Sequence, residues 1–107
     1  LHGPFGEDGT IQGFFEMIDK AYVGCDHRGA AVCMDKAMTK KLMQIHGIPI
    51  VPFITCSRYE WLNHKSDIVR KACEQLTFPV FVKPLHLGST VGVVKAEKED
   101  LEKAIEE

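Results

Sequence analysis

The sequence lacks any apolar run long enough to cross a membrane, and it has no excess of positive charge. A membrane-spanning helix needs about 20 consecutive apolar residues, so a helical membrane span is excluded. The 107 residues carry a formal net charge of −2, which argues against electrostatic binding of nucleic acid. Because 45% of the residues are hydrophobic and 26% charged, we expect a folded chain of about one small domain.

The four cysteines lack the spacing of a metal or redox site. Zinc knuckles and redox motifs place two cysteines only a few residues apart, and no pair among Cys25, Cys33, Cys56 and Cys73 does so. No signal-peptide pattern precedes them. We therefore expect reduced thiols that pack as small hydrophobic side chains in a cytoplasmic protein.

Two common nucleotide-binding patterns are also missing, but a third kind of phosphate loop is indicated. Neither G-x-x-x-x-G-K-[ST] nor G-x-G-x-x-G occurs, so a P-loop and a dinucleotide fingerprint are excluded. Instead, an apolar strand-like segment ends in Lys83 and is followed by Gly88-Ser89-Thr90. Backbone N–H groups of such a loop bind phosphate oxygens, and a lysine adds positive charge. An ordinary hairpin turn is the alternative that these residues leave open.

Helical and extended patterns alternate along the chain. We expect helices over 11–18, with Thr10 as N-cap, over 35–46 and over 100–107. A further helix is expected to begin at the capping box at 57–60 and to be interrupted at 63–65. Strands are expected at 21–23, 50–55, 80–83 and 91–95. This alternation predicts an α/β fold, with α+β as the alternative. A break in the pattern after Cys25 suggests a domain boundary near residues 25–33.

Two further segments carry candidate binding residues. His2 leads into a glycine-rich loop that contains Glu7, an arrangement suited to a small polar substrate; alternatively, Glu7 only favours the positive end of the next helix. Lys36 falls in the first turn of a helix, where the macrodipole disfavours a cation, so a bound anion would explain it. A solvated lysine is the alternative. The other histidines, His27, His46, His64 and His86, have no metal-ligand spacing and are expected to be surface or core residues.

Taken together, these segments resemble the D-alanine–D-alanine ligase family of the ATP-grasp superfamily. The resemblance rests on Leu1-His2-Gly3, Gly6 to Gly13, Tyr22-Val23-Gly24, Met34-Asp35-Lys36, Gly47-Ile48-Pro49, Phe81 to Pro84 and Gly88 to Val93, in the family's order. It implies that ATP phosphorylates the carboxylate of one D-alanine. The amine of a second D-alanine then attacks the acyl phosphate to give the dipeptide used in peptidoglycan.

The resemblance also implies roles for individual residues. Lys36 and Lys83 contact ATP phosphates, and Gly88, Ser89 and Thr90 close over the transferred group. Ser89 is the catalytic candidate and also holds the substrate side of the site. His2 lies near the first D-alanine, and Glu7 supports that substrate-binding pocket. Two positions depart from the family: Cys25 begins a stretch where small, serine-rich residues are usual, and Thr90 stands where a second serine is common.

The implied domain organisation is partial. Residues 1–25 are expected to end a Rossmann-like substrate-side domain, and residues 26–107 to form a truncated ATP-grasp central domain. The family's magnesium ligands lie outside this chain, so no metal ligand is assigned here and the chain alone is expected to be inactive. Its apolar faces are expected to be exposed where further domains would cover them.

The implied partners are ATP, D-alanine and a second copy of the complete enzyme in a homodimer, with no nucleic acid and no membrane. A D-alanine–D-lactate ligase, another ATP-grasp carboxylate–amine ligase and a non-catalytic nucleotide-binding module are the alternatives. The residues that separate peptide from depsipeptide ligases lie outside this chain.

Overall fold

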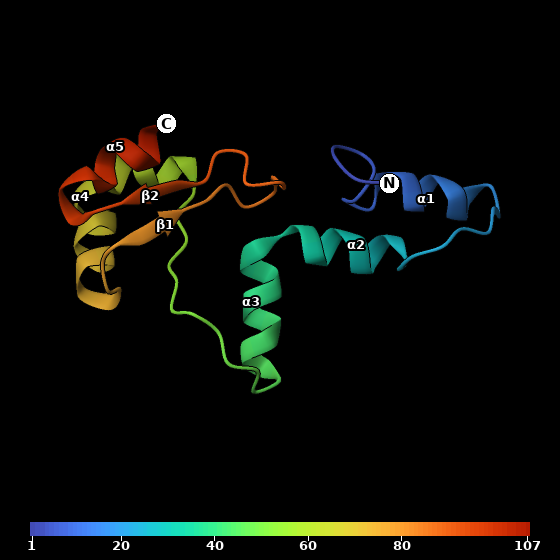
Figure 1. Cartoon of the computed structure of the whole chain (residues 1–107), viewed down its shortest axis with the longest axis horizontal. Coiled ribbons are helices and arrows are strands. Elements are labelled where there is room, and N and C mark those ends of the chain that lie inside the picture. The colour runs from blue at the N-terminus through green and yellow to red at the C-terminus, as the bar shows by residue number, and fades with distance from the viewer. The chain divides into compact units, whose positions relative to one another are not determined.

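The computed structural model describes all 107 residues and divides into two compact units (Figure 1). Unit 1 comprises Leu1–Ile50 and Leu85–Ser89, and unit 2 comprises Val51–Pro84 and Thr90–Glu107. The elements in chain order are α1 (Thr10–Met17), α2 (His27–Met34), α3 (Lys36–Ile45), α4 (Arg58–Gln75), β1 (Val80–Val82), β2 (Val94–Ala96), the 3₁₀ turn η1 (Lys98–Asp100) and α5 (Leu101–Glu106). The first three helices belong to unit 1 and the remaining elements to unit 2.

The chain is mostly helical, with one two-stranded sheet. Strand β1 pairs with β2 in antiparallel fashion, Val80 opposite Ala96 and Val82 opposite Val94. The strands expected at 21–23 and 50–55 do not form, so the expectation of alternating strands and helices was wrong in this respect. A strand needs a neighbouring strand for its backbone N–H and C=O groups, and a local apolar pattern does not supply one. The α+β alternative describes the chain better than α/β does.

Helix α2 was not expected from the sequence. Residues 26–29 were taken as a break in the pattern, whereas Asp26 is the N-cap of α2 and its Oδ1 accepts a hydrogen bond of 2.8 Å from the N–H of Gly29. An aspartate at this position is a strong start signal for a helix. The same four residues therefore begin a helix and do not interrupt one.

Helix α3 forms where the periodicity predicts it. Asp35 is its N-cap and accepts a hydrogen bond of 2.8 Å from the N–H of Met38. At the other end Gly47 has φ of +69°, and the N–H of Ile48 donates to Met43 O at 2.9 Å. This is the 6→1 bond of a Schellman motif. Both ends of α3 are thus fixed by local signals in the sequence.

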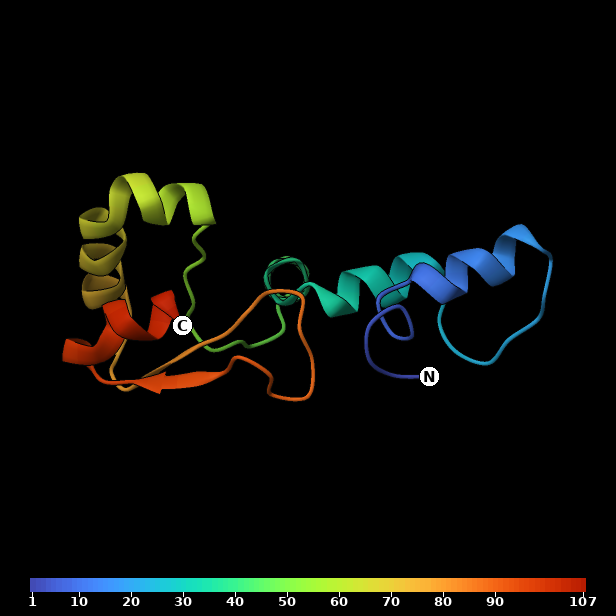
Figure 2. The ribbon, with the colours of Figure 1, turned by 90° about the horizontal axis from the view of Figure 1, so that it is seen from above.

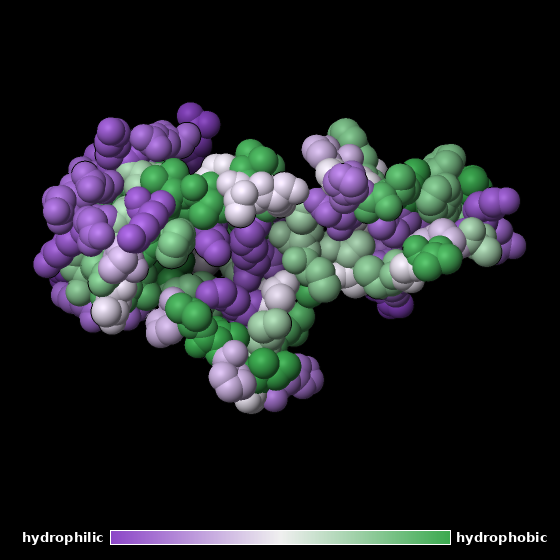
Figure 3. All heavy atoms as spheres, viewed as in Figure 1, coloured by the Kyte–Doolittle hydropathy of each residue, from purple (hydrophilic) through white to green (hydrophobic).

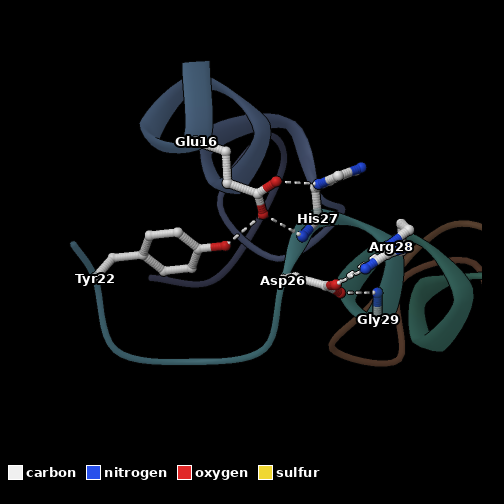
Figure 4. A network of polar contacts seen from close by, with 6 residues as sticks. All are labelled: Glu16, Tyr22, Asp26, His27, Arg28 and Gly29. Carbon is white, nitrogen blue, oxygen red and sulfur yellow. Dashed lines mark hydrogen bonds and ion pairs between the residues drawn. The ribbon is translucent and has the colours of Figure 1, made fainter. Parts of the chain in front are cut away.

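A polar network ties the end of α1 to the start of α2 (Figure 4). Glu16 Oε1 accepts hydrogen bonds from the Tyr22 hydroxyl at 2.9 Å and from the N–H of His27 at 3.1 Å. Glu16 Oε2 lies 2.6 Å from Nδ1 of His27. The N–H of His27 is the main cause of the lowered pKa of Glu16, and the Tyr22 hydroxyl comes next. The carboxylate therefore stays ionised while it holds the two helix ends together.

The network predicts a late ionisation of Tyr22. Removal from water and then the bond to Glu16 raise its pKa from 10.0 to about 12. Because the folded-state pKa is raised, the stabilising contribution of the neutral phenol is complete below pH 10 and is lost between pH 10 and about 12. We expect the difference in tyrosinate absorbance between the wild type and Tyr22→Phe to titrate near pH 12. A difference that titrates near pH 10 would contradict the network.

Unit 2 has a small apolar core between α4, the sheet and α5. The buried residues of unit 2 are Trp61, Ala72, Ala96, Leu101 and Ala104. The predicted capping box at the start of α4 is confirmed, because Ser57 and Glu60 exchange both of its hydrogen bonds. The expected interruption is also present: His64 has φ −137° and ψ 35°, and Figure 2 shows the bend in α4.

Unit 1 buries much less apolar surface than unit 2. Ala30 is its one buried hydrophobic residue. Large apolar side chains such as Met17, Ile18 and Ile45 are exposed, and Figure 3 shows apolar residues at the surface along α1 to α3. Hydrogen-bonded turns and caps therefore carry much of the local order in unit 1. None of the helices combines the length and hydropathy that crossing a membrane requires.

Candidate functional site

The glycine-rich segment before α1 is a compact turn that fixes the backbone around Glu7. Gly3 O accepts hydrogen bonds from the N–H groups of Gly6 at 3.0 Å and Glu7 at 3.3 Å. A Cβ on Gly6 would lie 3.0 Å from His2 O, so a side chain there would push against the backbone of His2. The side chain of His2 itself is exposed. The structure thus fixes the backbone of His2, but it leaves the proposed substrate role of the imidazole as a prediction.

The start of α1 differs from the expected one. The N-cap is Gly9 with φ of +95°, and Thr10 is the first helical residue. Asp8 provides the side-chain acceptor: its Oδ1 accepts from the N–H of Thr10 and its Oδ2 from that of Phe5, both at 3.0 Å. The hydrogen bonds with Thr10 lower the pKa of Asp8 most. Asp8 therefore has a structural role, and Glu7 is left as the candidate for ligand binding.

A cavity of about 410 Å³ lies beside this turn within unit 1. Glu7 lines it from the turn and Gln12 from α1. Cys25, just before α2, and Cys33, in α2, also line it. Gln12 Nε2 donates to Gly6 O at 3.0 Å, while its Oε1 is buried without a hydrogen-bond partner. The cavity has the size of a small-ligand site. Neither cysteine nor Gln12 was singled out as a site residue from the sequence.

Lys36 lies against the loop that follows β1. Its backbone N–H and its Nζ each donate to Leu85 O at 3.3 Å, and Nζ also donates to Leu87 O. Backbone carbonyl oxygens therefore already accept hydrogen bonds from this lysine at the helix start, and its contact with an ATP phosphate stays a prediction. Lys36 is nevertheless held beside Gly88, because the same loop continues directly into that residue.

Glu7 lies beside the same loop. A Cβ on Gly88 would be 2.9 Å from Oε1 of Glu7, so the carboxylate and the loop backbone are in contact. Unit 1 therefore brings three predicted site residues together, namely Glu7, Lys36 and Gly88, although they come from segments far apart in the sequence. All three lie at one end of α3.

The loop between the strands is long. It runs over residues 83–93, since β1 ends at Val82 and β2 begins at Val94. Ser89 and Thr90 have φ of +51° and +60°, and Gly92 has φ of +69°. Non-glycine residues in the left-handed region cost free energy and cluster at functional sites. The strands do form a hairpin, but its connection is far longer than the two-residue turn of the ordinary alternative.

Lys83 follows β1 in unit 2 and is exposed. Its Nζ lies 5.9 Å from the centroid of the Phe81 ring, within reach of a cation–π contact. Water and an aromatic ring therefore accommodate the charge of Lys83 at the end of an apolar strand, so its position alone does not indicate a bound anion. Its role at ATP phosphates remains a prediction.

Residues 1–107 contain no group of three or more His, Cys, Asp or Glu side chains that could hold a metal ion. All four cysteines are free thiols.

The comparisons with known proteins agree on one family. A family model described as D-ala D-ala ligase C-terminus matches residues 42–107, and one described as D-ala D-ala ligase N-terminus matches residues 1–25. The chain is 50% identical to a D-alanine--D-alanine ligase of Enterococcus faecalis and 47% identical to one of Staphylococcus haemolyticus, over its whole length. It covers 31% and 30% of those two relatives, so it spans about a third of their length.

Solved structures of D-alanine–D-alanine ligases also match this chain. The D-alanine-D-alanine ligase from Coxiella burnetii matches with a TM-score of 0.80 and 32% identity, over 98% of this chain and 29% of that one. The enzyme from Helicobacter pylori matches with a TM-score of 0.82 and 26% identity, over 98% of this chain and 30% of that one. The two relatives and the two solved structures named here are all D-alanine–D-alanine ligases. This chain belongs to the D-alanine–D-alanine ligase family.

Proposed function

We propose that these residues form part of an enzyme that joins two D-alanines at the expense of ATP. The observation that carries the proposal is the 50% identity to a named ligase over the whole chain, together with the meeting of Glu7, Lys36 and Gly88 in unit 1. The reaction passes through an acyl phosphate, and the protein's part in such chemistry is mainly positioning and neutralisation of charge. Its product serves peptidoglycan synthesis in the cytoplasm.

Each residue has a distinct task in this proposal. Lys36 and Lys83 neutralise ATP phosphates, and the backbone N–H groups near Gly88, Ser89 and Thr90 bind the oxygens of the transferred group. Ser89 also offers its hydroxyl to the substrate side. The left-handed backbone at Ser89 and Thr90 supports this, because such conformations turn successive N–H groups toward one concave face.

The substrate side is proposed to lie at the cavity in unit 1. Glu7 lines it and carries negative charge suited to the ammonium group of D-alanine. His2 would lie near the carboxylate of the same molecule. Residues 1–25 are proposed to end a Rossmann-like substrate domain, and residues 26–107 to form part of the ATP-grasp central domain. The magnesium ligands are proposed to belong to parts of the complete enzyme outside these residues, and the complete enzyme is proposed to form a homodimer.

A chimera tests the proposal directly. The 107 residues replace the matching third of the Enterococcus faecalis ligase, and phosphate release and dipeptide formation are measured with ATP and D-alanine. We expect kcat/KM within about tenfold of the parent enzyme, because the inserted residues should place the site correctly. A misplacement of 1 Å would lower kcat/KM by about 100-fold. The isolated chain is the control and is expected to release no phosphate.

A folded chimera without ligase activity would contradict the proposal. In that case ATP affinity, measured by calorimetry for the chimera and for its Lys83→Ala variant, would show whether a non-catalytic nucleotide-binding module remains. A Lys83→Ala variant with unchanged ATP affinity would remove the phosphate role from Lys83.

A further inference from the structure

The segment Leu85–Ser89, here called the phosphate loop, is attached to the start of α3 by two neighbouring residues. Lys36 binds the carbonyls of Leu85 and Leu87. Asp35 binds His86, whose Nε2 lies 3.1 Å from Oδ2 of Asp35. Every one of these contacts lies within unit 1. The loop is therefore held to α3 by a lysine and by a histidine–aspartate pair.

Asp35 uses its two carboxylate oxygens for different purposes. Oδ1 accepts the N–H of Met38 at 2.8 Å and caps α3, and Oδ2 faces His86. The N–H of Met38 lowers the pKa of Asp35 most, and His86 comes second. The carboxylate is thus ionised near neutral pH. Asp35 therefore connects the start of α3 to His86 in the phosphate loop, 51 residues away in the sequence.

We propose that His86 is a positioning residue for ATP, which acts with Asp35 to hold the backbone of Gly88 and Ser89 where the phosphates bind. The inference rests on the proposed function. His86 itself does not touch the nucleotide. Its side chain is 67% exposed and that of Asp35 is 31% exposed, and exposed ion pairs contribute little. Loss of the pair should therefore weaken ATP binding by about three- to fivefold, not abolish it.

The test uses the active chimera described above. His86→Ala is expected to raise KM for ATP about three- to fivefold while kcat changes less than about twofold. His86→Arg keeps a hydrogen-bond donor within reach of Asp35, so it should restore KM. Asp35→Asn keeps a good helix cap but removes the charge, and it should behave like His86→Ala.

The double variant His86→Ala/Asp35→Asn completes a thermodynamic cycle. Its KM is expected to equal that of either single variant, because the two side chains act as one unit. An unchanged KM in His86→Ala, or losses that multiply in the double variant, would overturn the inference while the ligase activity of the chimera still supports the proposed function. An inactive wild-type chimera would instead refute the proposed function itself.

Discussion

Replacement of Lys36 by alanine is expected to lower kcat/KM for ATP by about 100-fold in the chimeric ligase. A charge-assisted hydrogen bond to a phosphate contributes about 1.5–3 kcal/mol, and donors that stabilise developing charge contribute 10²–10³ in rate. Lys36 is the cation that unit 1 holds beside the phosphate loop, through Leu85 and Leu87. Lys41→Ala, on the exposed surface of the same helix, is the matched control and should stay within about twofold of the parent.

Lys36→Gln separates two roles of this lysine. A glutamine still donates N–H groups to the carbonyls of the loop, but it carries no charge. If Lys36 neutralises phosphate, then the glutamine variant is as impaired as the alanine variant. Recovery of activity in Lys36→Gln would show that the lysine only ties the loop to α3, and the phosphate role would have to be withdrawn.

The sequence predicts those elements whose ends are fixed by local chemistry. Helix α3 has an aspartate cap and a C′ glycine, and α4 has a capping box; both helices form as expected. The strands expected at 21–23 and 50–55 fail because strand formation depends on a neighbour, which a local apolar pattern does not reveal. Helix α2 was missed for a different reason. Its cap at Asp26 was read as a break, although aspartate is a common first signal of a helix.

The candidate site was predictable only in part. The resemblance to the ligase family singled out Glu7, Lys36 and Gly88, and the structure places them together. It did not single out His86, because its partner Asp35 is 51 positions away and no periodicity joins them. Nor could composition show that the charge of Lys83 is exposed beside Phe81. Contacts between distant segments depend on the folded chain, and local spacing does not encode them.

Replacement of Gly9 by alanine is expected to lower the free energy of unfolding of unit 1 by about 2–5 kcal/mol. Gly9 has φ of +95°, and a Cβ there would lie 2.5 Å from His27 O. The left-handed backbone costs about 1–2 kcal/mol for a residue with a side chain, and the overlap with a backbone oxygen adds about 1–3 kcal/mol. Urea unfolding, followed by circular dichroism, measures the loss.

Gly3→Ala is the matched control for this prediction. Gly3 also has a positive φ of +83°, but a Cβ there would meet nothing within 4 Å, so only the backbone cost of about 1–2 kcal/mol applies. Because the overlap in Gly9→Ala pushes α1 away from His27, it should also break the bond between Glu16 and that residue. Equal losses of unfolding free energy in the two alanine variants would contradict the close contact between Gly9 and His27 at the start of α2.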